Sequence, residues 1–244
     1  MQNEDENPRA LTPAATRSLT RRHAGELQVY LIRRSLNSGF MPGNYVFPGG
    51  RVDPEDRNFK VWQARVDLGR NGITQRLGGD LTAAEVLAYG VAAIREAFEE
   101  AGVFLAHRHE STPDDLKRIC QLRLTADLTP DWLQKLAVSE NWILTVSSLS
   151  RWSHWMTPER MKRRYDTRFF VAVLPSGQVC RPDGREATHG LWISPEKGLA
   201  GNLAGEIPLS PPTLMTLHEL LPFANLQDLA KETERRLWGE TLLP

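Results

Sequence analysis

The chain has 244 residues, of which 41% are hydrophobic and 25% are charged, a composition typical of an ordinary globular protein with a sizeable core. Lys and Arg together number 30, as do Asp and Glu together, so the formal net charge is zero. A chain without net charge has no long-range electrostatic attraction for nucleic acid or anionic membranes. We therefore expect neither as a partner, and only local binding of anions.

The N-terminus and the cysteines bear on the cellular compartment. Residues 1–22 lack the hydrophobic region of a secretory signal, and no apolar run approaches the roughly 18 residues that a membrane span needs. Cys120 and Cys180 form neither a CxxC pair nor a Cys/His ligand spacing, which argues against a zinc site. A disulfide between them is an alternative, but reduced thiols are favoured, so we expect a cytoplasmic protein.

The first third of the chain is dominated by strand and loop signals. Residues 1–22 are polar and without periodicity, which predicts an N-terminal tail or strap. The β-rich run 27–34 predicts a core strand. The segment 35–56 is dense in Gly, Pro, Asn and Asp, which predicts a long loop with a short strand at Tyr45–Phe47. Residues 57–80 are mixed and charged, and we expect them to be an insertion.

A strong helix signal follows the insertion. Thr82, with Glu85 three residues later, forms a capping box at the predicted start, and Gly102 lies where a C-terminal capping glycine belongs. Between these two ends, one apolar stripe recurs at helical spacing: Leu87, Val91, Ile94 and Phe98.

The remaining chain predicts a mixed succession of helices and strands. Short helices are predicted at 113–121 and 130–139, a strand at 168–175, a strand turning into a helix at 190–199, and C-terminal helices at 210–223 and 225–238. Because strands and helices interleave, we expect an α/β fold. A single domain would span residues 23–244, with residues 1–22 as its tail.

The end of the strong helix, with the sequence IREAFEEAGV, carries three crowded carboxylates. Glu96, Glu99 and Glu100 are offset by three and four residues, so they share one helix face, where each like-charge pair costs a few tenths of a kcal/mol. They also lie near the negative end of the helix dipole. A hard divalent cation such as Mg²⁺ would remove both penalties. The alternative is a solvated acidic face, and no His in this helix supports a di-iron site.

This cluster and an upstream glycine turn resemble the signature of the Nudix hydrolases, G-x5-E-x7-R-E-U-x-E-E-x-G-U, with U apolar. The match starts at Gly50, places Asp56 where the first Glu is expected, and is complete from Arg95 to Val103. The departure is the 38 residues between Asp56 and Arg95, where seven are usual. A box split in this way is similar to the branch that contains the mammalian peroxisomal coenzyme A diphosphatases.

A second pattern resembles that branch. Coenzyme A-type Nudix enzymes carry L-L-T-x-R-S-x3-R-x3-G-x3-F-P-G-G upstream of the box. In this chain the spacing matches from Arg34 and Ser35 through Gly43 to the Phe47–Gly50 turn. Gly39 stands where the pattern has its second Arg. This lost cation leaves room for an ADP-ribose, NADH or nucleotide-sugar pyrophosphatase.

The resemblance implies a fold and an activity. The fold would be a Nudix-type α/β/α sandwich with a mixed sheet, an insertion inside the Nudix box and extra C-terminal helices. The activity would be hydrolysis, by water attack with Mg²⁺ or Mn²⁺, of a nucleoside diphosphate linked to another moiety, with coenzyme A or acyl-CoA preferred. A non-catalytic nucleotide-binding regulatory module is the alternative from another class. The partner would be a small nucleotide substrate, and a homodimer is left open.

The resemblance also implies roles for individual residues. Metal ligands would be Glu96, Glu99, Glu100 and the Gly50 carbonyl, and the catalytic groups would be Glu96, Glu99 and, as general base, Glu186 in the loop before Trp192. Arg95, Asp56 and Gly102 would support the metal helix. Substrate would contact Arg34, Ser35, Phe47 and Gly49.

The basic segment 157–170 has two interpretations. It is either a solvated surface or a source of cations for substrate phosphates that replaces the one lost at Gly39. Trp152 and Trp155 next to it are expected in the core rather than stacked on a base, and His189 is expected to be a loop residue.

Overall fold

The structure, a computed structural model, describes residues 11–125, 128–238 and 240–242. Its main sheet runs in the order β10-β7-β8-β1-β2-β3, with β4 paired to β1 and β9 paired to β2. The β1/β8 and β7/β10 pairs are parallel and the others antiparallel, so the sheet is mixed, as expected. The strands are β1 (Thr12–His23), β2 (Glu26–Arg34), β3 (Tyr45–Val46), β4 (Gly49–Arg51), β7 (Ser150–Met156), β8 (Tyr165–Val173), β9 (Ala187–Ile193) and β10 (Glu240–Leu242).

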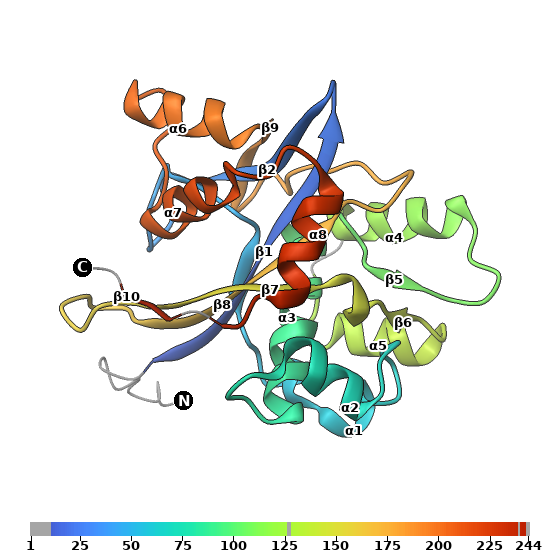
Figure 1. Cartoon of the computed structure of the whole chain (residues 1–244). Coiled ribbons are helices and arrows are strands. Elements are labelled where there is room, and N and C mark those ends of the chain that lie inside the picture. Colours follow the sequence, from blue (N-terminus) through green and yellow to red (C-terminus); the bar gives the residue numbers. More distant parts are fainter. Residues whose placement is uncertain (1–10, 126–127, 239, 243–244) are drawn as a thin grey trace, which may run out of the picture.

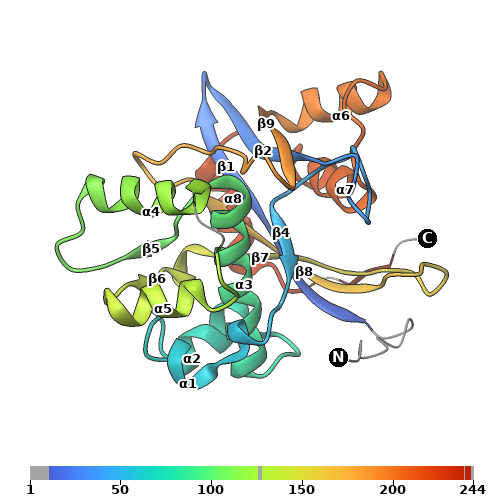
Figure 2. The same ribbon diagram turned by 180° about the vertical axis from the view of Figure 1, so that it is seen from behind.

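Helices cover both faces of this sheet. Figure 1 shows α8 in front of the sheet, and Figure 2 shows α3 in front of it from behind. One core cluster joins α3 to β1 and β2, and the other joins α7 and α8 to the opposite side of the sheet. The helices are α1 (Phe59–Trp62), α2 (Arg70–Ile73), α3 (Ala83–Ala101), α4 (Pro113–Thr125), α5 (Trp132–Ser139), α6 (Pro195–Leu203), α7 (Pro211–Leu220) and α8 (Leu226–Arg235). A separate ribbon pairs β5 (Ala106–His107) with β6 (Ile143–Leu144).

The expected N-terminal tail is wrong for residues 12–22, because they belong to the central strand of the sheet. β1 pairs with β8 along its length, and with β4 and β2 at its other edge. Ala15 and Leu19 are fully buried, and so is Arg17. A strand buried on both faces needs no alternation of polar and apolar residues. The small and polar residues of β1 therefore gave no strand signal in the sequence. Residues 1–10 lie outside the described residues.

The central position of β1 leads to a test of stability. Leu19→Ala would leave a cavity in the core between β1 and α3, and we expect it to lower the free energy of unfolding by about 2–5 kcal/mol. Urea denaturation would measure the change. Arg22→Ala, on the exposed end of the same strand, is the control and should change stability by less than about 0.5 kcal/mol. Equal, small losses in both variants would contradict the placement of the strand.

Most other predicted elements are confirmed. The run 27–34 is β2, and the short strand expected at Tyr45–Phe47 is β3. At the start of α3, Thr82 N–H donates to Glu85 Oε2 at 2.8 Å and Glu85 N–H to Thr82 Oγ1 at 3.3 Å, which completes the capping box. Gly102 ends this helix with φ of 70°, a left-handed conformation that glycine adopts without strain.

Residues 57–80, expected as an insertion, form α1, α2 and a π-helical turn (Thr74–Gly78). Trp62, Ile73 and Leu77 are buried in the same core cluster as α3. The insertion is therefore a packed cover on the helix that carries the glutamates. β7 was not predicted, because its buried residues include Arg151, Ser153 and His154.

Two further observations concern disulfides and membranes. Cys120 and Cys180 are both free thiols. Within residues 11–125, 128–238 and 240–242, no single helix has the length and apolarity to cross a membrane. One pair, Arg70–Gly78 with Ala83–Ala101, meets both criteria only when its two helices, bent by 74°, are taken together.

Candidate functional site

The C-terminal half of α3 borders a pocket of about 750 Å³. The other walls come from β1, β4, the loop after β2, the hairpin between β7 and β8, and the start of α7, while residues 57–80 do not contribute. A cavity of this size suits a nucleotide-sized ligand. Of the predicted site residues, the pocket brings together Arg34, Phe47, Gly49, Gly50, Arg95, Glu96, Glu99, Glu100 and Glu186.

The turn at β4 lies directly against the carboxylates of α3. Gly49 N–H donates to Glu100 Oε2 at 2.7 Å. A Cβ on Gly50 would lie 2.5 Å from the carboxyl carbon of Glu96, and one on Gly49 would lie 2.5 Å from the Ala15 carbonyl oxygen. Gly49 therefore requires glycine, because a Cβ would meet backbone atoms of β1, whereas a side chain at position 50 would displace the Glu96 carboxylate.

Arg95 joins the two halves of the split signature. Its Nε donates to Asp56 Oδ1 at 3.1 Å and its Nη2 to Asp56 Oδ2 at 2.9 Å, a bidentate pair buried on both sides. Nη2 also donates to the Arg51 carbonyl oxygen at 2.8 Å. Although 38 residues separate Asp56 from Arg95 in sequence, the fold places them in contact, and the shorter Asp reaches the guanidinium.

The same arginine holds two of the three helix carboxylates. Arg95 Nη1 donates to Glu96 Oε1 at 2.9 Å and to Glu99 Oε2 at 3.0 Å. Asp53 is a fourth carboxylate, 3.3 Å from Nη2; the sequence analysis missed it, although it precedes Asp56 in the same acidic turn. Trp132 on α5 donates its Nε1–H to the other oxygen of Glu99. Charge-assisted hydrogen bonds of this kind fix the orientation of a carboxylate.

One guanidinium facing four carboxylates leaves excess negative charge. Burial raises the pKa of Glu96 to about 7, and repulsion by Glu99 adds to this while Arg95 opposes it. Burial, followed by repulsion from Glu96, raises the pKa of Glu100 well above its ordinary value. The pKa values of Glu99 and Asp56 are also raised by burial, with Arg95 opposing. Because carboxylates in this state are stabilised by added positive charge, the cluster favours a bound cation.

The donor chemistry fits a hard dication, which prefers oxygen ligands. In the described part of the chain, no group of three or more Asp, Glu, His or Cys side chains is already assembled for a metal ion. Glu99 uses one oxygen for Arg95 and the other for Trp132. Glu96 and Glu100, beside the Gly49–Gly50 turn, are therefore the pair best placed to bind a metal ion, and Glu99 would have to exchange a partner to join them.

Glu186 reaches the pocket from the loop before β9. Its side chain is exposed and lines the cavity, and its negative charge contributes to the raised pKa of Glu100. The backbone there is fixed, because Glu186 N–H donates to Asp183 Oδ2 at 3.1 Å and Ser35 N–H donates to the Glu186 carbonyl at 3.0 Å. His189 was expected in a loop, but it lies in strand β9, paired with Arg33 of β2. It is exposed and is not a lining residue of the pocket.

Of the predicted substrate contacts, Arg34 and Phe47 lie in the pocket wall and Ser35 lies outside it. Arg34 lines the pocket, and its Nε and Nη2 donate to Ser38 Oγ at 3.1 and 3.0 Å. Phe47 forms a buried part of the wall. Ser35 is not a lining residue; its hydroxyl accepts from Asn37 N–H at 3.2 Å. Ser35 is thus placed to support the Glu186 loop through its backbone.

The basic segment and its tryptophans divide into core and pocket. Trp152 and Trp155 are buried, as expected. Arg168 is also buried, and its two terminal nitrogens each pair with Asp80 at 3.0 Å. Arg160, by contrast, lines the pocket.

Comparisons with known proteins agree with this architecture. The family model described as the NUDT19 Nudix domain matches residues 9–220. The chain is 30% identical to human acyl-coenzyme A diphosphatase NUDT19 over 84% of its length, and 28% identical to the Xenopus laevis protein of that name over 86%. It spans only 63% of the length of either relative. A crystal structure of a NUDIX hydrolase from Alicyclobacillus acidocaldarius matches with a TM-score of 0.71 at 24% identity, covering 94% of this chain and 97% of that one, which shows the fold.

Proposed function

The chain belongs to the NUDT19 Nudix domain family of Nudix hydrolases, and on that premise we propose that it hydrolyses the diphosphate of coenzyme A or acyl-CoA. The products would be adenosine 3′,5′-bisphosphate and the phosphopantetheine half. The observation that carries the proposal is the pocket in which partly buried Glu96 and buried Glu100, both with raised pKa values, lie beside the Gly49–Gly50 turn. The resemblance in sequence to acyl-coenzyme A diphosphatases supports the choice of substrate.

Nudix hydrolases generally use divalent metals, and here Glu96 and Glu100, with Glu99 and the Gly50 carbonyl, would hold Mg²⁺ or Mn²⁺. Such an ion supplies charge neutralisation on the phosphate oxygens and lowers the pKa of bound water. Arg95 keeps Glu96 and Glu99 oriented toward the pocket. Asp56, which precedes the insertion in sequence, accepts hydrogen bonds from Arg95 and fixes its position. Because Arg95 in turn holds Glu96 and Glu99, these carboxylates do not have to reorganise during the reaction.

The remaining groups would carry the proton and the substrate. Glu186, exposed in the pocket, would accept the proton of the attacking water. The water oxygen forms a bond to one phosphorus atom, the bridging P–O bond breaks, and the leaving phosphate keeps the bridging oxygen. Arg34, on the wall near Glu100, would bind a phosphate oxygen.

The direct test is a panel of substrates. With Mg²⁺ or Mn²⁺ we expect turnover of coenzyme A to exceed that of ADP-ribose and NADH, with products identified by mass. Chelation of the metal should abolish turnover and re-addition should restore it, because the carboxylates would again repel one another and the substrate. Faster turnover of ADP-ribose than of coenzyme A would overturn the substrate. No turnover of any member would favour a binding module.

Glu186 offers a separate test of the general base. We expect Glu186→Gln to lower kcat by about 10²-fold with little change in KM, because general base catalysis contributes at least that much. The acid limb of the pH profile of kcat should also change. Glu159→Gln, an exposed glutamate of the β7–β8 hairpin that is not a lining residue, is the control. An unchanged kcat would assign the base to a carboxylate of α3 instead.

The cytoplasmic location and the homodimer considered from the sequence stay predictions.

A further inference from the structure

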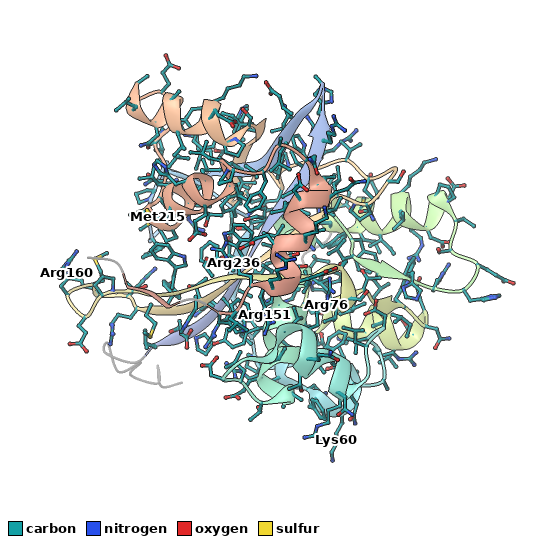
Figure 3. All side chains as sticks on the ribbon, in the orientation of Figure 1. Lys60, Arg76, Arg151, Arg160, Met215 and Arg236 are labelled. Atoms are coloured by element: carbon teal, nitrogen blue, oxygen red, sulfur yellow. The ribbon has the colours of Figure 1, made fainter. Side chains whose placement is uncertain are left out.

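The carboxylates of α3 and an arginine of the β7–β8 hairpin line the same pocket. Its α3 end carries Glu96, Glu99 and Glu100, and Glu186 adds a further carboxylate. At the hairpin between β7 and β8, the lining residues include Arg160 and the apolar Met161. Figure 3 shows Arg160 on this hairpin, which extends away from α4 and α5. A ligand that filled the cavity would meet these carboxylates, together with Arg95 and Arg34, at one end and Arg160 on the hairpin.

Arg163, on the same hairpin, packs against Gly39. A Cβ on Gly39 would lie 2.5 Å from Arg163 Nη1, 3.3 Å from Cζ and 3.5 Å from Nη2. The guanidinium therefore occupies the space that a side chain at position 39 would need. Gly39 lacks the arginine side chain that the coenzyme A pattern has at this position. The absence of a side chain there leaves room for the guanidinium of Arg163.

The neighbours of this contact are fixed at the pocket wall. The rings of Phe40 and Tyr165 pack edge to face, with centroids 5.2 Å apart, and both residues line the pocket. On the other side of Gly39, Ser38 accepts hydrogen bonds from Arg34. Arg163 is exposed and neither it nor Gly39 lines the pocket, but Phe40, next to Gly39, and Tyr165, on the hairpin, both do, so the contact between Arg163 and Gly39 borders this part of the wall. Among the described residues, no carboxylate forms an ion pair with Arg163, which leaves its charge available to a ligand.

We propose that Arg163, with Arg160, binds a phosphate monoester of the substrate that is distinct from the diphosphate cleaved at α3. The inference rests on the proposed function. A planar guanidinium suits a phosphate monoester, because it offers parallel N–H donors to two oxygens. In a substrate of the coenzyme A class, this group is the phosphate on the 3′ position of the adenosine ribose. The hairpin would thus select 3′-phosphorylated nucleotides over those without this group.

The test compares ligands that differ in one phosphate. Calorimetry would measure the binding of adenosine 3′,5′-bisphosphate and of adenosine 5′-monophosphate, and kinetics would compare kcat/KM for coenzyme A and dephospho-coenzyme A. We expect Arg163→Gln to weaken binding of the bisphosphate by about 10- to 100-fold, as expected for a lost charged hydrogen bond, and to leave the monophosphate unchanged. Gly39→Ala should act in the same direction, because its Cβ displaces the guanidinium while the charge remains in the chain.

Lys162→Gln is the matched control, because it removes one positive charge from the exposed position next to Arg163 and leaves the contact between Arg163 and Gly39 in place. A loss in this control equal to that in Arg163→Gln would overturn the proposal, since a general field would then explain both. Equal binding of the two nucleotides by the wild-type protein would overturn it as well. A retained preference for the bisphosphate without turnover of coenzyme A would reject only the proposed function. Turnover of coenzyme A with an unaltered preference in Arg163→Gln would reject only the role of the hairpin.

Discussion

Glu100→Gln is expected to lower kcat for coenzyme A by about 10³-fold, because the charge stabilisation lost with a metal ligand is worth several kcal/mol. Glu100 is buried, and its carboxylate accepts the Gly49 N–H. A glutamine preserves the volume and can still accept this hydrogen bond through its amide oxygen, so the fold should be retained. The loss would then report the missing charge. Steady-state kinetics at several Mg²⁺ concentrations would measure it, and the metal requirement should shift upward.

The control is Glu234→Gln on α8, an exposed glutamate outside the pocket, which should have the activity of the wild-type protein. Thermal unfolding of both variants would exclude a general loss of structure. Activity unaffected by Glu100→Gln would remove the basis of the metal site and revive the interpretation of the protein as a binding module.

Arg95→Met is expected to have the largest effect on stability. The variant would leave Asp56 buried without its bidentate partner, and breaking a buried ion pair from one side costs about 3–5 kcal/mol. It would also release Glu96 and Glu99 from their shared donor. Urea denaturation would measure the free energy of unfolding, and Arg57→Met, an exposed arginine at the start of the insertion, is the control.

A second variant separates the ion pair from simple loss of packing. Asp56→Asn removes the charge that Arg95→Met would leave unpaired. We expect the double variant to lose less stability than the sum of the two single variants, because interacting residues are not additive. Additive losses would show that Arg95 and Asp56 act independently, and that the insertion does not close the split signature through this contact.

Local signals were enough to place α3 and its carboxylates. The capping box, the apolar stripe and Gly102 act within one helix, so their geometry follows from helical spacing alone. The crowding of Glu96, Glu99 and Glu100 on one face is equally local. The predicted strands at β2 and β8 were found for a related reason, since their apolar runs are continuous in sequence.

Contacts between segments that are distant in the chain could not be predicted from the sequence. β1 was missed because its burial depends on partners more than 100 residues away in β8. In addition, a run that contains Arg17 and Ser18 does not have the apolar pattern of a core strand. Asp53 and Trp132 were missed as partners of the Arg95 and glutamate cluster for the same reason. The contact of Arg163 with Gly39 joins two loops that no local rule connects.

The sequence by itself determined the helix α3, the spacing of its glutamates and the family to which they point, because these properties depend on neighbours within a few residues. Only the tertiary structure decided that Asp56 meets Arg95 across the insertion, that the N-terminal segment is the middle of the sheet, and that a hairpin arginine occupies the place opened by Gly39. These contacts depend on how distant segments pack, and the free energy of packing is a property of the assembled core rather than of any one segment.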